Sequence, residues 1–260
     1  MSSDETVLFQ RQGAVARITL NRPDVLNAID DEMRLALRDS LQSVAADEST
    51  RVVVITGSGR FFSAGADLRA SRPSAENTTR LLLEEYGPGL RAIAEMPKPV
   101  IAALNGPAVG IGLAYALASD LIVMAESAYL QAPFIKLSLL PDGGLSWMLT
   151  RALGYQRAFE FVADAQSLAA ARALELGLVN RVVKDERVLS EAAAWADSLC
   201  TRAPLGLAAA KQALRRHATL DYVGSMESEA RLQGPLVETD DCREGFDAFI
   251  EHREPRFKGS

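Results

Sequence analysis

The chain has 260 residues and a mass of 28.0 kDa, enough for one large domain or for one domain with a small appendage. Hydrophobic residues make up 48% and charged residues 24%, a balance that excludes a disordered chain, a collagen-like repeat and a highly charged coiled coil. With 28 basic and 34 acidic residues, the net charge is −6, which argues against a nucleic-acid-binding protein.

Strands and helices alternate along the first part of the chain. Apolar residues alternate with others in the first predicted strand, whereas uninterrupted apolar runs at 52–56 and 100–104 predict strands buried on both faces. Asp30 is placed to cap the first helix. The predicted strands are 15–20, 52–56, 100–104, 121–125 and 129–131, and the predicted helices are 30–44 and 110–118. This alternation predicts an α/β core.

The later part of the chain is predicted to be helical. We divide the chain into an α/β core at 1–195 and a helical region at 196–260 that serves docking or oligomerisation. Apolar residues such as Trp195 and Leu214 support this role. The polar segment 69–89 lacks a clear period and is expected to be a mobile loop or lid, with Glu84 and Glu85 on a solvated face.

Several classes of site and location are disfavoured by the residues. The 19 residues Val100–Ala118 carry no charge, but Asn105-Gly106-Pro107 interrupts them, which favours a buried strand, a turn and a buried helix over a membrane span. Two cysteines and two histidines without metal-ligand spacing indicate neither a disulfide framework nor a metal site. The N-terminus lacks the pattern of a signal peptide. We therefore expect a soluble, cytoplasmic protein with no membrane partner.

Two segments rich in small residues follow buried strands and are candidates for ligand binding. They are RFFSAGADL at Arg60–Leu68 and NGPAVGIGL at Asn105–Leu113. Small residues let a ligand approach the main chain, and unpaired amide groups at a helix start can face an oxyanion. The same small residues also suit tight packing of a loop on a helix. Both G-x-G runs lack the third glycine of a dinucleotide-binding motif.

Taken together, the two segments resemble the enoyl-CoA hydratase/isomerase family, the crotonase superfamily. Further stretches with the same resemblance are NRPDVLNA (21–28), LPDGGLSWMLTRALG (140–154), ARALELGLVNRVV (171–183) and DDCREGFDAFIEHREPRFK (240–258). The resemblance implies a crotonase-like spiral of β-β-α turns with a C-terminal helical trimerisation region. It also implies an acyl-CoA substrate, a homotrimer or dimer of trimers, and no metal or other cofactor.

The resemblance also implies a thioester oxyanion hole made by the backbone N–H groups of Ala66 and Ile111. The second donor in this family is most often a glycine, but the donor is an amide, so an isoleucine is tolerable if its side chain points away. Two aimed N–H groups would stabilise the enolate that forms when C2 of an acyl thioester loses a proton.

Contacts to the substrate and its CoA moiety are implied for a further set of residues. Asp67 can alternatively cap a following turn, and Phe134 can alternatively belong to the apolar core. The basic CoA contact from a neighbouring subunit falls on Lys258, while His252 replaces the usual lysine. The set is Asp24, Val25, Asn27, Ala64, Ala66, Asp67, Leu68, Gly110, Phe134 and Lys258.

The acid and base of a hydratase are missing. The two hydratase glutamates of the family fall on Ala114 and Phe134, which can neither activate water nor donate a proton. Asp142 stands where the family's isomerases carry Glu or Asp, and one carboxylate suits a 1,3-proton shift. In Pro-Asp-Gly-Gly, Asp142 is also a good N-cap for a helix at 143–151.

The favoured function is an enoyl-CoA isomerase that moves a double bond from the 3,4 to the 2,3 position, with Asp142 as its base. Isomerisation of a ring-epoxide aromatic CoA thioester is an alternative, and enoyl-CoA hydration is a weaker one because both glutamates are absent. An acyl-CoA-binding protein without catalysis is the alternative from another class.

Overall fold

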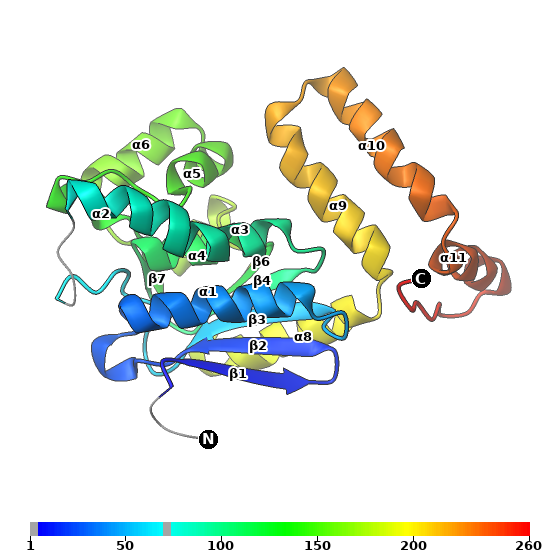
Figure 1. Ribbon diagram of the computed structural model, residues 1–260, viewed down its shortest axis with the longest axis horizontal. Coiled ribbons are helices and arrows are strands. Elements are labelled where there is room, and N and C mark those ends of the chain that lie inside the picture. Colours follow the sequence, from blue (N-terminus) through cyan, green and yellow to red (C-terminus); the bar gives the residue numbers. More distant parts are fainter. Residues whose placement is uncertain (1–4, 70–73) are drawn as a thin grey trace.

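A computed structural model of the chain describes residues 5–69 and 74–260 and shows a mixed α/β spiral followed by projecting helices (Figure 1). The main sheet has the order β1-β2-β3-β4-β6-β9, with β1 antiparallel to β2 and the later pairs parallel. Its strands are β1 (Val7–Gln12), β2 (Val15–Leu20), β3 (Val52–Gly57), β4 (Val100–Leu104), β6 (Leu121–Ala125) and β9 (Arg181–Val183). The predicted strands and the crotonase-like α/β fold are confirmed.

The structure also contains a smaller, three-stranded sheet, whose strands lie in sequence between later strands of the main sheet. It has the order β5-β7-β8, in which β5 runs parallel to β7 and β8 antiparallel to it. These strands are β5 (Ala108–Val109), β7 (Tyr129–Gln131) and β8 (Leu168–Ala169). Because β5 directly precedes a helix, this sheet fixes where that helix begins.

Helices cover the main sheet. Every residue of β3 and β4 is buried, so both faces of these strands are covered, as their unbroken apolar runs predict. Helix α1 (Asp31–Ala46) packs against β1 and β2, and α8 (Val188–Cys200) packs against β3, β4 and β6. Asp30 caps α1, since its carboxylate accepts a hydrogen bond from the amide of Met33 at 2.9 Å.

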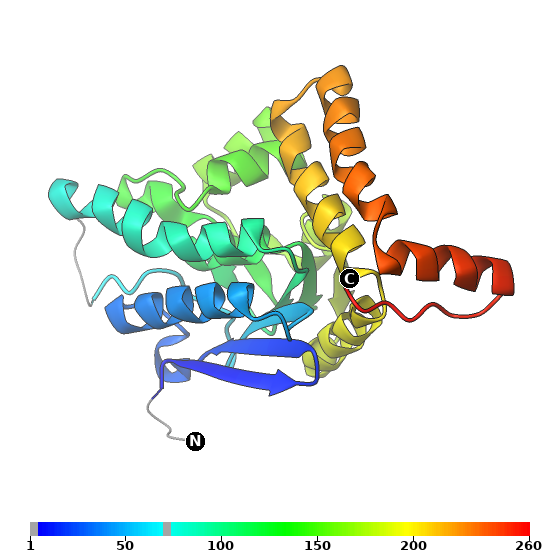
Figure 2. The ribbon, with the colours of Figure 1, turned by 45° about the vertical axis from the view of Figure 1, so that its right-hand side comes forward.

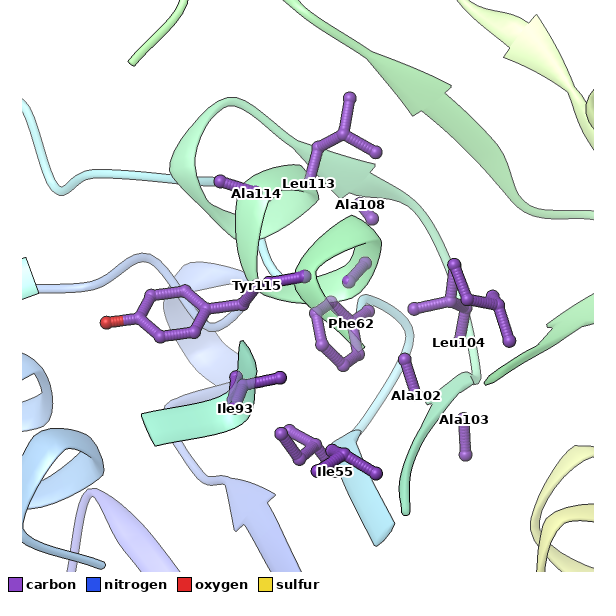
Figure 3. Close-up of a cluster of buried hydrophobic side chains, with 14 of the residues drawn as sticks. Ile55, Phe62, Ile93, Ala102, Ala103, Leu104, Ala108, Leu113, Ala114 and Tyr115 are labelled. Atoms are coloured by element: carbon purple, nitrogen blue, oxygen red, sulfur yellow. The ribbon is translucent and has the colours of Figure 1, made fainter. Parts of the chain in front are cut away.

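The core around β3 and β4 continues into helix α4 (Ile111–Ala118). Figure 3 shows Phe62 and Tyr115 packed among Ile55, Ile93 and Leu104. All five of these side chains are buried. The charge-free stretch 100–118 is thus a strand, a turn and a buried helix, as predicted. No helix in the part of the chain that the structure describes is long and apolar enough to cross a membrane.

The remaining elements connect these layers. The helices are α5 (Leu145–Leu153), α6 (Tyr155–Asp164), α7 (Ala170–Glu175), α9 (Pro204–Arg216), α10 (Tyr222–Val237) and α11 (Asp240–Glu251). Short helical turns are η1 (Pro23–Val25), η3 (Pro133–Leu137), η4 (Asp185–Arg187) and η5 (His217–Thr219).

The segment 69–89, expected to be a polar loop or lid, is helical from residue 75 onward, and that prediction is wrong. It forms α2 (Ala75–Arg80), a π-helical turn η2 (Leu81–Tyr86) and α3 (Gly87–Glu95). Ser74 caps α2 by accepting a hydrogen bond from the Asn77 amide. Residues 70–73 of the expected lid lie outside the described residues.

Glu85, expected on a solvated face, is instead held inside the protein. Its side chain is 12% exposed and forms an ion pair with Arg34 at 2.6 Å and another with Arg80 at 2.7 Å. The partner Arg34 is far away in sequence, so the local pattern of polar residues around Glu85 gave no sign of its burial.

The C-terminal helices α9, α10 and α11 project from the body (Figure 2). The boundary drawn between residues 195 and 196 falls inside α8, whose Ala192 and Ala196 are fully buried on the sheet. Helix α9 is anchored to the body by Asp120, which pairs with Lys211 at 2.7 Å and Arg215 at 2.8 Å. Many large apolar side chains of the projecting helices are exposed: Leu214, Tyr222, Val223, Met226, Val237, Phe246, Phe249 and Ile250.

Candidate active site

The two small-residue segments meet in the folded chain. Ser63 and Ala108 form a parallel bridge, and the Val109 amide donates to the Ser63 carbonyl at 2.9 Å. Gly65 has φ +91°, and a Cβ there would lie 2.9 Å from the Val109 carbonyl oxygen. Only glycine combines this backbone conformation with so close an approach, which explains the glycine in the first segment.

The backbone N–H of Ala66 faces away from its neighbouring strand. Ile29 donates to the Gly65 carbonyl at 2.7 Å and accepts from the Asp67 amide at 2.9 Å. In extended backbone, successive residues present their N–H and C=O groups to opposite sides. The N–H of Ala66 is therefore directed away from Ile29, at an exposed residue.

The backbone N–H of Ile111 is the first of helix α4. Its N-cap, Gly110, has φ +57° and ψ −128°, so the chain turns sharply into the helix. First-turn amides have no partner within their helix, and the N–H of Ile111 is one of them. The isoleucine side chain is only 3% exposed and packs toward Gly143.

Both amide-bearing residues line one cavity of about 330 Å³. Its walls come from the two small-residue segments, the π-helical turn η2, η3 and the loop before α5. Eight of the sequence-predicted residues line it: Ala64, Ala66, Asp67, Leu68, Gly110, Ile111, Phe134 and Asp142. The structure thus brings together the proposed amides, the proposed base and part of the proposed CoA contacts.

The other four residues predicted to contact CoA do not line this cavity. Asp24 and Val25 are exposed on η1, outside the cavity lining. Asn27 is fully buried, and its side-chain amide donates to the carbonyls of Ser58 and Phe61. The side chain of Asn27 therefore helps to hold the first segment in place. Lys258 lies in the C-terminal tail after α11, where its amide donates to Asp241.

Asp142 lies in the turn between η3 and α5. Helix α5 begins at Leu145 with Gly144 as its N-cap, so the predicted capping by the Asp142 side chain is wrong. Gly143 and Gly144 both have positive φ, and this turn separates Asp142 from the helix. Among residues 5–69 and 74–260, no group hydrogen-bonds to Oδ1 of Asp142, although this atom is buried. Burial raises the pKa of Asp142 to about 6.

Asp67 is the other carboxylate of the cavity lining, and it differs from Asp142. Its Oδ2 pairs with Arg22 at 3.0 Å, and its Oδ1 accepts from the Arg69 amide at 3.1 Å. The second of these bonds matches the alternative in which Asp67 caps a turn. Both Asp67 oxygens are therefore already engaged, whereas Oδ1 of Asp142 has no hydrogen-bond partner among the described residues, so Asp142 is the better candidate for proton transfer.

The whole chain was compared with known families and proteins. The enoyl-CoA hydratase/isomerase family model matches residues 10–260. The chain belongs to this family. It is 37% identical to a probable enoyl-CoA hydratase of Rhodobacter capsulatus, over 99% of both chains. It is also 37% identical to the 1,2-epoxyphenylacetyl-CoA isomerase of Escherichia coli, over 98% of this chain and 99% of that one.

Solved structures agree with this assignment. The enoyl-CoA hydratase of Bacillus anthracis superposes with a TM-score of 0.93 at 30% identity, over 98% of this chain and 100% of that one. Membership in the enoyl-CoA hydratase/isomerase family makes the protein an acyl-CoA enzyme. Both hydratase and isomerase names occur among the relatives, so the relatives do not decide between these two activities. The residues of the cavity have to be considered for that choice.

At the two positions where the sequence resemblance places the hydratase glutamates, the side chains are buried hydrocarbon groups. Ala114 is fully buried and Phe134 is 8% exposed. A Cβ on Gly143 would lie 2.8 Å from the Ala114 Cβ, so the Asp142 loop packs directly on the start of α4.

Arg34 and Tyr86 are among the residues of the cavity wall that sequence reasoning missed. The Arg34 guanidinium lies over the Tyr86 ring, 5.1 Å from its centroid. Arg34 belongs to α1 and Tyr86 to η2, so only the fold brings them together. A local signal existed in Gly87-Pro88, because a proline without an N–H disturbs the helical hydrogen-bond ladder just after Tyr86.

The raised pKa of Asp142 predicts a pH-dependent rate. A general base acts as its carboxylate, so kcat/KM for a 3-enoyl-CoA should fall as the pH drops through about 6. The measurement is a kcat/KM profile from about pH 5 to 8, with the Kd of an unreactive acyl-CoA measured over the same range as control. A flat rate profile, or a parallel change in Kd, would show that Asp142 is not the base.

Proposed function

We propose that the protein is an enoyl-CoA isomerase that moves a carbon–carbon double bond from the 3,4 to the 2,3 position of a CoA thioester. The observation that carries this proposal is the buried Oδ1 of Asp142, unpartnered within the described residues, in a cavity that Ala66 and Ile111 also line. A 1,3-proton shift needs one base and an oxyanion site. In this proposal Asp142 is the base, and the N–H groups of Ala66 and Ile111 form the oxyanion site.

The proposed chemistry uses three groups of the chain. The Asp142 carboxylate takes a proton from C2, and the electrons pass to the thioester oxygen as an enolate. The N–H groups of Ala66 and Ile111 hold that oxygen. The neutral Asp142 then returns a proton to C4 as the enolate collapses to the 2,3-alkene, so the carboxylate is regenerated. A base with a pKa of about 6 is ionised at neutral pH and can also give the proton back.

Mass spectrometry of the product in deuterium oxide tests this route. The shuttle predicts a 2-enoyl-CoA that carries deuterium at C4 to the extent that Asp142 exchanges with solvent. It predicts no oxygen gain, because water does not add. A 3-hydroxyacyl-CoA as the first product from a 3-enoyl-CoA would contradict the proposal.

Isomerisation of a ring-epoxide aromatic CoA thioester is the second candidate. It is supported by the relative named 1,2-epoxyphenylacetyl-CoA isomerase, which is 37% identical over nearly the whole chain. The same base and the same amides would serve it. Hydration is disfavoured by Ala114 and Phe134, although relatives carry hydratase names. A binding protein without catalysis is disfavoured by the buried Oδ1 of Asp142, which has no hydrogen-bond partner among the described residues.

The CoA moiety is proposed to lie along the first small-residue segment and η1. Ala64 and Leu68 line the cavity. Asp24 and Val25 are exposed on η1, which follows the end of β2. Lys258 lies on the projecting C-terminal region, so in this proposal it reaches the CoA of a neighbouring copy. No metal or further cofactor enters the proposed reaction.

We further propose that the protein is a homotrimer, alone or as a dimer of trimers, in the cytoplasm. The apolar side chains exposed on α9, α10 and α11 favour burial against another copy. Trp195, expected to contribute, instead lies under the Arg181 guanidinium within the same chain. Analytical sedimentation should show trimers or hexamers at micromolar concentration. A stable monomer at that concentration would contradict this assembly.

A further inference from the structure

One part of the acyl cavity is polar. Most of its wall in this region is leucine, from η2 and from the loop before α5. Arg34, Tyr86 and Asp142 interrupt that apolar lining. In the proposed mechanism, isomerisation of a hydrocarbon acyl chain requires Asp142, but it assigns no role to Arg34 or Tyr86. Their presence therefore bears on which acyl group the cavity accepts.

The charge of Arg34 is neutralised by its neighbours. Its guanidinium pairs with Glu85 at 2.6 Å and with Asp31 at 2.9 Å, and the Arg34 side chain is only 6% exposed. A cation that is already paired with two carboxylates offers little attraction to an anionic substrate group. The polar wall is thus suited to a neutral polar group rather than to a carboxylate.

Tyr86 is held by Arg34 and keeps a hydrogen to donate. The guanidinium lies over the Tyr86 ring, 5.1 Å from its centroid, and holds the ring in the cavity wall. A phenolic hydroxyl can donate as well as accept, so the O–H of Tyr86 can donate to an acceptor in the cavity. Burial raises the pKa of Tyr86 above its ordinary value, so the hydroxyl stays protonated at neutral pH.

The backbone also fixes Tyr86 in the cavity wall. The amide of Gly87 donates to the carbonyl of Leu82, five residues earlier, and Pro88 follows without an N–H. A Cβ on Gly87 would lie 2.9 Å from that carbonyl oxygen, so glycine is required there. This π-helical turn places Leu81, Leu82 and Tyr86 together on the cavity.

We infer that the Tyr86 hydroxyl, oriented by Arg34, donates a hydrogen bond to an oxygen atom of the acyl group, and that the enzyme selects acyl-CoA thioesters with a hydroxyl, oxo or epoxide oxygen. The inference rests on the proposed function for the location of the acyl group. A buried donor left without a partner is costly, so a hydrocarbon acyl group forfeits stabilisation that an oxygen-bearing one gains.

Binding of unreactive thioesters tests this selection separately from catalysis. The Kd of phenylacetyl-CoA is compared with those of its 2-, 3- and 4-hydroxy derivatives by calorimetry, using the full-length wild-type protein. We expect at least one hydroxy derivative to bind about 10-fold more tightly than phenylacetyl-CoA. Tyr86→Phe should remove that preference. Tyr155→Phe, at a 65% exposed tyrosine on α6, is the matched control and should keep it.

Two results would overturn the inference. One is equal affinity of the wild type for all four thioesters, and the other is a preference for a hydroxy derivative that survives in Tyr86→Phe. Thermal melting shows whether Tyr86→Phe is folded, and Arg34→Lys, which keeps the charge but loses the planar guanidinium over the Tyr86 ring, serves as a second variant with the same expected loss of preference. Because these ligands do not react, the outcome does not depend on whether Asp142 is the base.

Discussion

Asp142→Asn is expected to lose at least about 100-fold in turnover of a 3-enoyl-CoA while it keeps its affinity for acyl-CoA. The substitution keeps the size and shape of the side chain but removes the group that accepts the proton. The amides of Ala66 and Ile111 are untouched, so the oxyanion site and the CoA contacts persist. Steady-state turnover and the Kd of a saturated acyl-CoA, measured on the same preparation, separate the two effects.

The stability of the same variant provides the control. The pKa of Asp142 is raised from 3.8 to about 6, so the native state binds the proton more tightly than the unfolded state. Stability is therefore lost as the pH rises from about 4 to about 6. Asparagine avoids that loss, so the variant should melt at a higher temperature than wild type at pH 7 and lose this advantage near pH 4. Unchanged turnover with a lower melting temperature at pH 7 would instead assign Asp142 a structural role.

Ala66→Pro is expected to lower turnover by about 100-fold, which corresponds to about 3 kcal/mol of transition-state stabilisation. Proline removes the N–H that faces away from Ile29, and no side chain replaces a lost amide donor. Ala66→Ser keeps the N–H and is the matched control, with turnover close to wild type. Melting temperature and acyl-CoA affinity must be measured beside the rate, because proline can also distort the loop. Wild-type turnover in a folded Ala66→Pro protein would remove this amide from the site.

The elements that the sequence predicted well are those decided by local patterns. Asp30 caps α1 because a side-chain acceptor precedes an amphipathic run, and this pairing needs no distant partner. The unbroken apolar runs of β3 and β4 indicate burial on both faces for the same reason. The resemblance then placed Ala66, Ile111 and Asp142, and the fold brings all three to one cavity.

The predictions that were wrong depend on contacts between distant residues. Glu85 is only partly exposed and pairs with Arg34, 51 residues away in sequence, and a polar stretch gives no sign of such a partner. The turn at Asp142 matches a helix cap locally, yet Gly143 and Gly144 adopt positive φ and the helix starts at Leu145. Gly143 also lies against Ala114, a contact that the local sequence does not reveal.

The most direct test of the account is a comparison of three activities of the purified protein: isomerisation of a 3-enoyl-CoA, hydration of a 2-enoyl-CoA, and isomerisation of a ring-epoxide aromatic CoA thioester. With Asp142 as the one base and hydrocarbon side chains at Ala114 and Phe134, the account predicts that one or both isomerisations proceed and that hydration is far slower. Hydration of a 2-enoyl-CoA at a rate equal to that of isomerisation would contradict it.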